Sequence, residues 1–298
     1  MFKEKRLMWL YGLTSAHVGS GDNLSYIDMP IQREIHTNFP KIEASSLKGS
    51  LRNAMRSNGT EEKVNAILGS WDNGNVASAV AISDAKILFF PVKSAKGVFA
   101  WVTCPMTMRR FMQDCGMLDD CEFGKNLESL DLSDAALTCG SCTLVLNQKK
   151  IMLEEAVFES RVDAEFEKWI ESSIKYFPTD EIMIKEEAFK KRVVMVSDDD
   201  FEYFVSQSTE VVTRIRINPE TKIIEPGALF TEEYLPPESI LYSLLFITDE
   251  KKKEGGLTAK EIEKNMGRMI KNNLLQIGGN ATLGKGLFKI NWEGKKND

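Results

Sequence analysis

The stretch from His17 to Glu34, HVGSGDNLSYIDMPIQRE, holds the residue types best suited to chemistry beside a phosphate. A Gly-Ser-Gly loop in it presents His17, Asp22 and Asp28 near a basic segment. A carboxylate held beside phosphates can ligate Mg²⁺ or accept a proton from a ribose 2′-hydroxyl. Asp28 precedes Met29-Pro30, however, and an acid is also a common turn or cap residue. Both interpretations of this loop stay open.

Three cations, Lys48, Arg52 and Arg56, recur at every fourth position of the segment 45–57. They border an apolar stripe with the same spacing, which predicts a helix capped by Ser45 or Ser46. A helix N-terminus favours anions, and a cationic stripe beside it suits phosphates. Such a stripe is also typical of a solvated face. The apolar residues are Leu47, Leu51 and Met55.

The glycine-rich segment 277–286, IGGNATLGKG, spells GxxxxGK from Gly279 to Lys285. A phosphate-binding P-loop needs Ser or Thr next, a preceding strand and a following helix. Position 286 is Gly, and we expect a helix before the loop and a strand after it, which argues against nucleotide hydrolysis. The glycines favour close approach of the backbone to another group, and Lys285 suits a phosphodiester chain. An ordinary turn before a strand explains the loop equally well.

Two arginines, Arg214 and Arg216, alternate with apolar residues in the segment 209–225. This alternation, on both sides of Asn218-Pro219, predicts a β-hairpin with both guanidinium groups on one face. Charges on an edge hairpin either bind a ligand or guard the edge against aggregation.

Other chemistries find little support. The chain has two histidines, His17 and His36, and no HxxxH or HExxH zinc motif. Cys139 and Cys142 form a single CxxC without a second pair at metal-binding spacing. The five cysteines are an odd number, and a chain of 33.6 kDa needs no disulfide staples, so we expect reduced thiols in the cytoplasm.

The elements that position these residues predict an α+β fold with an antiparallel or mixed sheet. We expect strands at 6–13, 85–103, 239–248 and 287–292, and helices at 45–57, 161–177 and 258–275. The helix at 161–177 has an apolar face that includes Val162 and Phe177. No window approaches 18 uninterrupted apolar residues, so we expect no membrane span.

Charge is distributed unevenly along the 298 residues. The formal net charge is −6, which by itself argues against a nucleic-acid binder. Residues 1–113 nevertheless carry +5, residues 114–200 carry −11, and residues 201–298 are neutral. We interpret 105–200 as an acidic lobe inserted in a single domain that spans 1–298. Its acidity is typical of a solvated face.

The sequence resembles the backbone-forming RAMP subunit of type III-B (Cmr) CRISPR effector complexes. The N-terminal signature of that family matches HVGSGDNLSYIDMPIQRE followed by TNFPKIEASSLKGSLR. Further matches follow in the same order along the chain. They are SDAKILFFPVKSAKGVFAWVT, STEVVTRIRINPET, FTEEYLPPESILYSLLF and LQIGGNATLGKG.

The resemblance implies a modified ferredoxin-like (RRM-like) palm with a β-hairpin thumb at 209–226. It implies that copies of the chain stack along a guide RNA, with other subunits of the complex, and that target RNA pairs with the guide. Asp28 takes the position required for metal-dependent cutting of the target, with Mg²⁺ or another divalent cation as cofactor. The implied helpers at the cut are His17, Glu232, Glu233 and Tyr234.

The same resemblance implies where the guide is held. Ser46, Lys48 and Arg52 match the helix that grips guide phosphates, and Gly278, Gly279 and Lys285 match the loop that approaches the guide. Arg56, Arg214 and Arg216 extend this RNA-binding set through their charge. Two functions remain in competition: an endoribonuclease subunit, and a guide-RNA scaffold without chemistry. Asp28 distinguishes them.

Overall fold

The structure is a computed structural model that describes most of the chain. It describes residues 2–22, 26–70, 76–118, 132, 135–174, 177, 185–252 and 255–292. Cys121, Ser25 and a large part of the predicted acidic lobe lie outside these ranges. In the described ranges, no helix has the length and apolar character that crossing a membrane requires.

Helices and strands alternate along the chain in a mixed α/β order. The helices are α1 (Ala44–Arg56), α2 (Glu61–Leu68), α3 (Pro105–Cys115), α4 (Ala164–Ile174), α5 (Glu186–Lys190), α6 (Asp198–Gln207) and α7 (Ala259–Met269), with short 3-10 turns at Asn147–Lys149, Lys271–Asn273 and Ala281–Leu283. The strands are β1 (Glu4–Gly12), β2 (Lys41–Ile42), β3 (Val80–Ile82), β4 (Ala85–Ser94), β5 (Val98–Thr103), β6 (Ala135–Thr138), β7 (Lys150–Leu153), β8 (Ala156–Val162), β9 (Val193–Met195), β10 (Glu210–Ile217), β11 (Ile224–Tyr234), β12 (Ile240–Ile247), β13 (Leu274–Gln276) and β14 (Leu287–Asn291).

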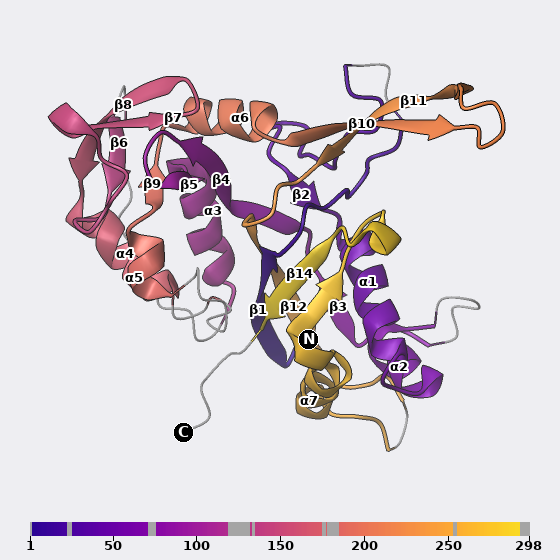
Figure 1. The fold of residues 1–298 in the computed structure, drawn as a ribbon. Coiled ribbons are helices and arrows are strands. Elements are labelled where there is room, and N and C mark those ends of the chain that lie inside the picture. The colour runs from indigo at the N-terminus through magenta and orange to yellow at the C-terminus, as the bar shows by residue number, and fades with distance from the viewer. Residues whose placement is uncertain are drawn as a thin grey trace.

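One large sheet forms the framework, in the order β13-β14-β1-β12-β4-β5-β9-β6-β8-β7. Its pairings are antiparallel except for β5 with β9 and β6 with β8, so the predicted mixed sheet is confirmed. In Figure 1, α1, α2 and α7 lie beside the strands β14, β1 and β12, whereas α4 and α5 lie at the other end with β6 to β9. The central strands join these two parts.

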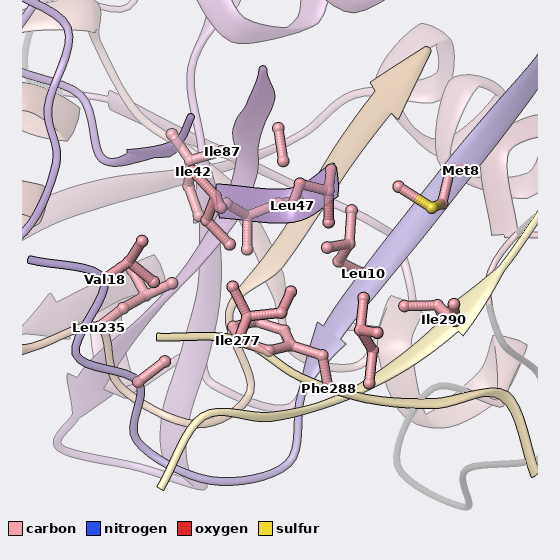
Figure 2. Packing of buried hydrophobic residues seen from close by; sticks show 14 of the residues in the cluster. Met8, Leu10, Val18, Ile42, Leu47, Ile87, Leu235, Ile277, Phe288 and Ile290 are labelled. Atoms are coloured by element: carbon pink, nitrogen blue, oxygen red, sulfur yellow. The ribbon is translucent and has the colours of Figure 1, made fainter. Parts of the chain in front are cut away.

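Strand β1 shows why the sheet is buried on both faces. Successive side chains of a strand point to opposite faces. Met8 and Leu10 belong to one hydrophobic cluster, which includes the apolar stripe of α1 (Figure 2). Trp9 and Tyr11 belong to a second cluster with Phe111 of α3 and aromatic residues of α4 and α5. From Leu7 onward β1 is apolar and buried, as expected of a strand covered on both faces, whereas its first three residues, from Glu4 to Arg6, are charged and partly buried.

The second half of the sheet closes on itself. From β4 the pairing runs through β5, β9, β6, β8 and β7 and returns to β4 at Ser94 and Leu153. Apolar residues of these strands contribute to the first cluster, including Val92, Val102 and Ile151. These strands therefore form a small ring that encloses part of the core and leaves β4 shared with the rest of the sheet.

The predicted hairpin is confirmed as β10 paired with β11, a two-stranded sheet separate from the large one. Its second strand continues to Tyr234, beyond the predicted end. Asn218 accepts hydrogen bonds from the backbone of Glu220 and Thr221 and so fixes the turn. The hairpin projects away from the body of the molecule (Figure 1).

Two predicted helices are too long. The helix predicted at 258–275 ends at Met269, because Ile270 leaves helical geometry and Asn272 and Asn273 take positive φ. The strand β13 follows, so a strand rather than a helix precedes the glycine-rich loop. The helix predicted at 161–177 begins at Ala164, and Val162, placed on its buried face, is an exposed end of β8.

The N-terminus of α1 is also capped differently from the prediction. Neither Ser45 nor Ser46 is its cap; the cap residue is Glu43, whose side chain makes no capping hydrogen bond. Asp84 accepts a hydrogen bond from the backbone N of Ala44 at 2.9 Å, and Gln32 accepts one from that of Glu43 at 2.7 Å. Side chains from distant segments therefore bind two amides at the start of the helix in place of a local cap.

Candidate functional site

Three segments that are distant in sequence meet at the base of the hairpin. They are the loop after β1, the end of β11 and the glycine-rich loop before β14. Each is anchored by an apolar residue in the core, and these anchors are Val18, Leu235 and Ile277 (Figure 2). Because the anchors sit next to His17, Tyr234 and Gly278, packing of the core places these site residues.

Asp28 is exposed and is held by one residue of β11. Its Oδ2 accepts hydrogen bonds from the backbone N of Thr231 at 2.7 Å and from its Oγ1 at 2.9 Å. The bonds to Thr231 lower the pKa of Asp28, because they favour the charged carboxylate. Beside it, Met29 forms a parallel bridge with Glu232. The chain thus presents an ionised, oriented carboxylate to solvent at the root of the hairpin.

A second polar cluster lies on the other face of β11, around the buried carboxylate of Glu232. Arg214 Nε donates to its Oε2 at 3.1 Å, and His17 Nε2 lies 3.7 Å from its Oε1. Asn280 Nδ2 donates to Oε1 at 2.7 Å, and the Tyr234 hydroxyl also donates to the carboxylate. Burial alone would raise the pKa of Glu232, but the hydrogen bonds from Tyr234, Asn280 and Arg214 outweigh it and lower the pKa.

Tyr234 and His17 are enclosed by this cluster. Tyr234 is fully buried and His17 is 6% exposed. Arg214 donates to the Tyr234 hydroxyl, and Lys285 Nζ lies 4.7 Å from the centre of its ring. His17 Nδ1 is 2.7 Å from the backbone oxygen of Glu233. These two side chains therefore lie beneath the surface of the site and do not face solvent.

Glu233, which the resemblance implies as a helper at the cut, lies on the same face of β11 as Thr231. Its carboxylate is occupied by hydrogen bonds to neighbouring segments. Its carboxylate accepts from the backbone N of Ile31 at 2.9 Å, from Arg33 at 2.6 Å and from Thr209 at 2.8 Å. These contacts fasten the Pro-Ile-Gln-Arg-Glu segment to the hairpin. In the described part of the chain, no hydrogen bond or ion pair joins Asp28 to His17, Glu232 or Tyr234.

A cleft of about 520 Å³ separates the hairpin from the glycine-rich loop. Its polar lining consists of Arg214, Arg216, Glu225, Glu232 and Asn280. Apolar atoms of Met29 and Phe230 are among its other walls. Arg216 is exposed and pairs with Glu225 at 3.4 Å, whereas Arg214 is held by Glu232. A cleft with this mixture can hold a polar, partly aromatic ligand.

The glycines of the C-terminal loop allow its backbone to pack closely against other backbone of this protein. A Cβ on Gly278 would lie 2.2 Å from the backbone oxygen of His17, and Gly278 has a φ of 88°. A Cβ on Gly286 would lie 2.1 Å from the backbone oxygen of Ile277. Gly279 N donates to the oxygen of His17 at 2.9 Å. The close approach that the glycines predict is therefore made to the loop after β1.

The cationic stripe of α1 divides into three different environments. Arg52 donates to Asn65 at 2.8 Å and to the backbone oxygens of Leu68 and Gly69 at the end of α2. Arg56 pairs with Glu61 at 2.7 Å. Lys48 has no hydrogen bond or ion pair with any described residue, and burial together with the charge of Arg52 lowers its pKa. Ser46 accepts a hydrogen bond from Gln32 at 3.3 Å.

Lys48 is therefore the member of the stripe available to an anion. A half-buried ammonium next to a guanidinium, with no carboxylate partner among the described residues, gains from a bound phosphate.

A divalent cation would find one suitable carboxylate here. No group of three His, Cys, Asp or Glu side chains in the described ranges is arranged to hold a metal ion. Asp28 Oδ2 is engaged by Thr231, which leaves Oδ1 for a further ligand. Mg²⁺ commonly binds one or two carboxylates and completes its shell with water and substrate phosphates. Asp28 fits that role only together with ligands from a substrate.

Sequence reasoning missed Thr231 and Asn280. Thr231 orients Asp28, and Asn280 joins the glycine-rich loop to Glu232 and Tyr234. Both lie within stretches that carry the family resemblance, but neither has a residue type or spacing that predicts its contacts. The pairing of β11 with the loop after β1 decides them.

Comparisons with known proteins agree with this arrangement. The model of the RAMP superfamily matches residues 9–289. The CRISPR system Cmr endoribonuclease Cmr4 of Pyrococcus furiosus is 39% identical over 288 residues, which are 95% of this chain and 94% of that protein. The crystal structure of oligomeric Cmr4 from the same organism has a TM-score of 0.74 at 34% identity, over 97% of this chain and 98% of that chain.

A more distant structure shares the fold. A chain in the cryo-EM structure of the type III-B Cmr-beta complex bound to cognate target RNA has a TM-score of 0.71 at 21% identity. The match covers 98% of each chain.

Proposed function

We propose that this chain, which belongs to the RAMP superfamily, is the backbone subunit of a type III-B CRISPR effector complex and cleaves target RNA within it. The Pyrococcus relative is named an endoribonuclease, and a solved structure of it is described as oligomeric. Guide RNA, target RNA, further copies of the chain and other subunits of the complex are the proposed partners. A cytoplasmic location follows from that role.

The observation that carries the endoribonuclease proposal is the exposed Asp28 carboxylate, held by Thr231 at the root of a projecting hairpin. An acid that only closed a turn would bond within its own loop. This one is oriented by a strand about 200 residues away in sequence and faces solvent, where an RNA backbone can reach it. Orientation of a reacting group is a large part of catalysis.

Asp28 is better suited to orienting the reacting groups than to removing a proton. Its lowered pKa keeps it charged near neutral pH but makes it a weak base. We expect it to hold the attacking 2′-hydroxyl, directly or through a divalent cation that the RNA phosphates help to bind. The cation would supply charge neutralisation at the phosphate. A single carboxylate that orients the reacting groups predicts slow cleavage that depends on the assembled RNA groove.

RNA binding is assigned to the surfaces that surround Asp28. Lys48 would pair with a guide phosphate, Arg216 would add positive charge in the cleft, and Lys285 would add it beside Tyr234. Ser46, Arg52 and Arg56 would act mainly by keeping α1 in place, since each already has a protein partner. Sequence specificity would come from base pairing with the guide, so base-reading side chains are unnecessary.

The finer description of the fold belongs to the same proposal. The sheet of β13, β14, β1, β12 and β4 would be the ferredoxin-like palm, and the hairpin would be the thumb that interrupts the paired RNA. The segment 105–200 would be an acidic lobe inserted in the single domain, facing solvent or a partner subunit.

The test replaces Asp28 in the assembled complex. Asp28→Asn keeps the size of the side chain and removes the charge, and we expect it to slow target cleavage by at least about 100-fold. Guide binding and assembly should persist, because Asp28 is exposed and packs nothing. Asp22→Asn, a second exposed acid of the same loop, is the matched control and should cleave normally.

If the Asp28→Asn complex cleaves at the rate of the unmodified complex, the endoribonuclease proposal fails. The result would then support the alternative function, a guide-RNA scaffold without chemistry. Removal of divalent cations with EDTA tests the cofactor separately. We expect EDTA to stop cleavage and added Mg²⁺ to restore it.

A further inference from the structure

Asn280 joins the glycine-rich loop to the base of the hairpin. Its Nδ2 donates to Glu232 Oε1 at 2.7 Å and to the Tyr234 hydroxyl at 2.9 Å. Its backbone is left-handed, with φ 60° and ψ 31°, and asparagine is one of the few residues that adopt this conformation readily. The residue type therefore suits the backbone and supplies the side-chain donor at the same time.

The loop that carries Asn280 is fixed to the body of the protein. Gly279 N donates to the backbone oxygen of His17, and Gly278 leaves no room there for a side chain. The backbone oxygen of Asn280 accepts from Leu283 N at 2.9 Å, which closes the turn that follows. Ile277, just before these residues, is buried in the core. Asn280 is consequently a fixed point to which the base of the hairpin is attached.

The hairpin is attached to the body of the protein at its base. It forms a separate two-stranded sheet, which the backbone bridge between Met29 and Glu232 joins to the loop after β1, and several of its apolar residues, including Val211, Ile215 and Leu229, are at least half exposed. Its base is held on one face through Glu233 and on the other through Glu232. Asn280 bonds two side chains of β11 on the second face.

The same strand orients Asp28. Thr231, which binds the Asp28 carboxylate, directly precedes Glu232 in β11. A shift of the strand at Glu232 is a shift at Thr231, because one residue of an extended chain spans only about 3.3 Å and cannot absorb it. The contact of Asn280 therefore reaches Asp28 through two neighbouring residues of one strand.

We propose that Asn280 is a positioning residue for RNA cleavage: it clamps Glu232 and Tyr234 to the fixed loop and so holds the hairpin base, and with it Asp28, in the reactive geometry. The inference rests on the proposed endoribonuclease function. Asn280 touches no reacting atom in this account. Its loss should lower the rate of the cleavage step and leave binding of guide and target unchanged.

The surroundings of Glu232 provide a test that general damage to the fold would not mimic. In Asn280→Asp, a carboxylate replaces the amide donor opposite Glu232 Oε1. Two carboxylates at this distance cannot both ionise without repulsion, so the pair takes up a proton as the pH falls. The charged and titratable groups that face this pair from the neighbouring elements are His17, Arg214, Tyr234, Lys285 and Glu210.

The experiment measures single-turnover cleavage and target affinity of the assembled complex between about pH 5.5 and pH 8. Asn280→Gly keeps the left-handed backbone and loses both hydrogen bonds, and we expect its rate to fall about tenfold or more at every pH. Asn280→Asp should lose more at pH 8 and recover toward the Asn280→Gly rate, or above it, as the pH falls. Target affinity should stay within about twofold for both variants, since a positioning residue acts on the rate.

Asn272 supplies the matched control. It is also left-handed, with φ 56°, it is exposed, and its side chain has no hydrogen-bond partner in the described ranges. Asn272→Gly and Asn272→Asp should cleave as the unmodified chain does, with the same pH profile. They control for the effect of glycine or a new charge near the C-terminal loop.

Each outcome decides the matter. Unchanged rates in both Asn280 variants overturn the inference, as does an Asn280→Asp rate that falls by the same factor at every pH. Should Asn280→Asp fail to fold, Asn280→Gly and hydrogen exchange of the β11 amides carry the test, with faster exchange at 230–235 expected. Failure of the proposed endoribonuclease function gives a different result. In that case the unmodified complex does not cleave target RNA, or the Asp28→Asn complex cleaves it as fast as the unmodified complex.

Discussion

At the scale of single residues, Thr231 fixes the orientation of the Asp28 carboxylate. It donates two hydrogen bonds to one oxygen of Asp28, and these bonds lower the pKa of the carboxyl. A carboxyl group with a lowered pKa is charged at every pH above its ordinary pKa. It loses the charge only as the pH falls through the lowered pKa. Cleavage that depends on this charge should therefore be insensitive to Asp28 titration around neutral pH.

Removing the Thr231 hydroxyl tests this account. In Thr231→Val the pKa of Asp28 should rise toward its ordinary value, because one of the two donors is lost, and cleavage should slow by about tenfold as the carboxylate loses its fixed orientation. Carboxyl ¹³C NMR titration of the isolated chain measures the first effect and single-turnover cleavage measures the second. Thr213 lies opposite Thr231 on β10, is exposed and has no side-chain hydrogen bond in the described chain. Thr213→Val should change neither quantity.

At the scale of elements, helix α1 carries one stripe of cations whose members have different contacts. Arg52 ties α1 to the end of α2 through three hydrogen bonds, two of them to backbone oxygens. Lys48 has no partner among the described residues and is partly desolvated. Spacing alone predicts the same role for these two side chains, but their surroundings differ, and we expect their roles to differ as well.

Alanine substitutions should reveal the difference. Arg52→Ala should lower the free energy of unfolding by about 1.5–3 kcal/mol, since charged hydrogen bonds to otherwise unsatisfied carbonyls are lost. Lys48→Ala should leave stability nearly unchanged, weaken guide binding and reduce the salt dependence of that binding by about one phosphate contact. Chemical denaturation and binding at several salt concentrations measure these effects. Equal loss of guide affinity without destabilisation in both variants would contradict this division.

Arg56→Ala is the internal reference for a surface pair. Arg56 and Glu61 are both exposed, and an exposed ion pair contributes little to stability. Arg56→Ala should therefore lower the free energy of unfolding by less than Arg52→Ala does.

At the scale of the whole molecule, two hydrophobic clusters share one sheet. Strand β1 contributes Leu10 to one cluster and Trp9 to the other, so neither half of the core is independent of it. The base of the site also depends on the first cluster, through the three anchors next to His17, Tyr234 and Gly278. Loss of packing in the core should therefore disturb the site as well as the fold.

Leu10→Ala tests this coupling. The side chain is fully buried, and its truncation should lower the free energy of unfolding by about 2–5 kcal/mol with one cooperative transition. Leu229→Ala, at a side chain 63% exposed on the hairpin, should stay within about 0.5 kcal/mol of the unmodified chain. Denaturation followed by fluorescence and by circular dichroism measures both. Two separate transitions in Leu10→Ala would show that the halves of the core are independent.

Sequence periodicity determined most of the elements, because a buried face leaves the same spacing whatever packs against it. The helix at 45–57, the hairpin and the strands at β1, β4, β5, β12 and β14 were all predictable in this way. The ends of helices were not, since Asp84 and Gln32 cap α1 from elsewhere and asparagines with positive φ end the segment after α7. Composition misled more than pattern did: the net charge of −6 averages a positive first third with an acidic middle.

The sequence by itself named Asp28, the cationic stripe and the glycine-rich loop, because residue type and order along the chain are sufficient to recognise a family. Tertiary structure decided what each of them contacts. Thr231 and Asn280 became site residues only when β11 paired with the loop after β1 and the glycines seated their loop on His17. Long-range pairing brings together residues whose separation in sequence leaves no periodic trace, and the chemistry of the site is made from those contacts.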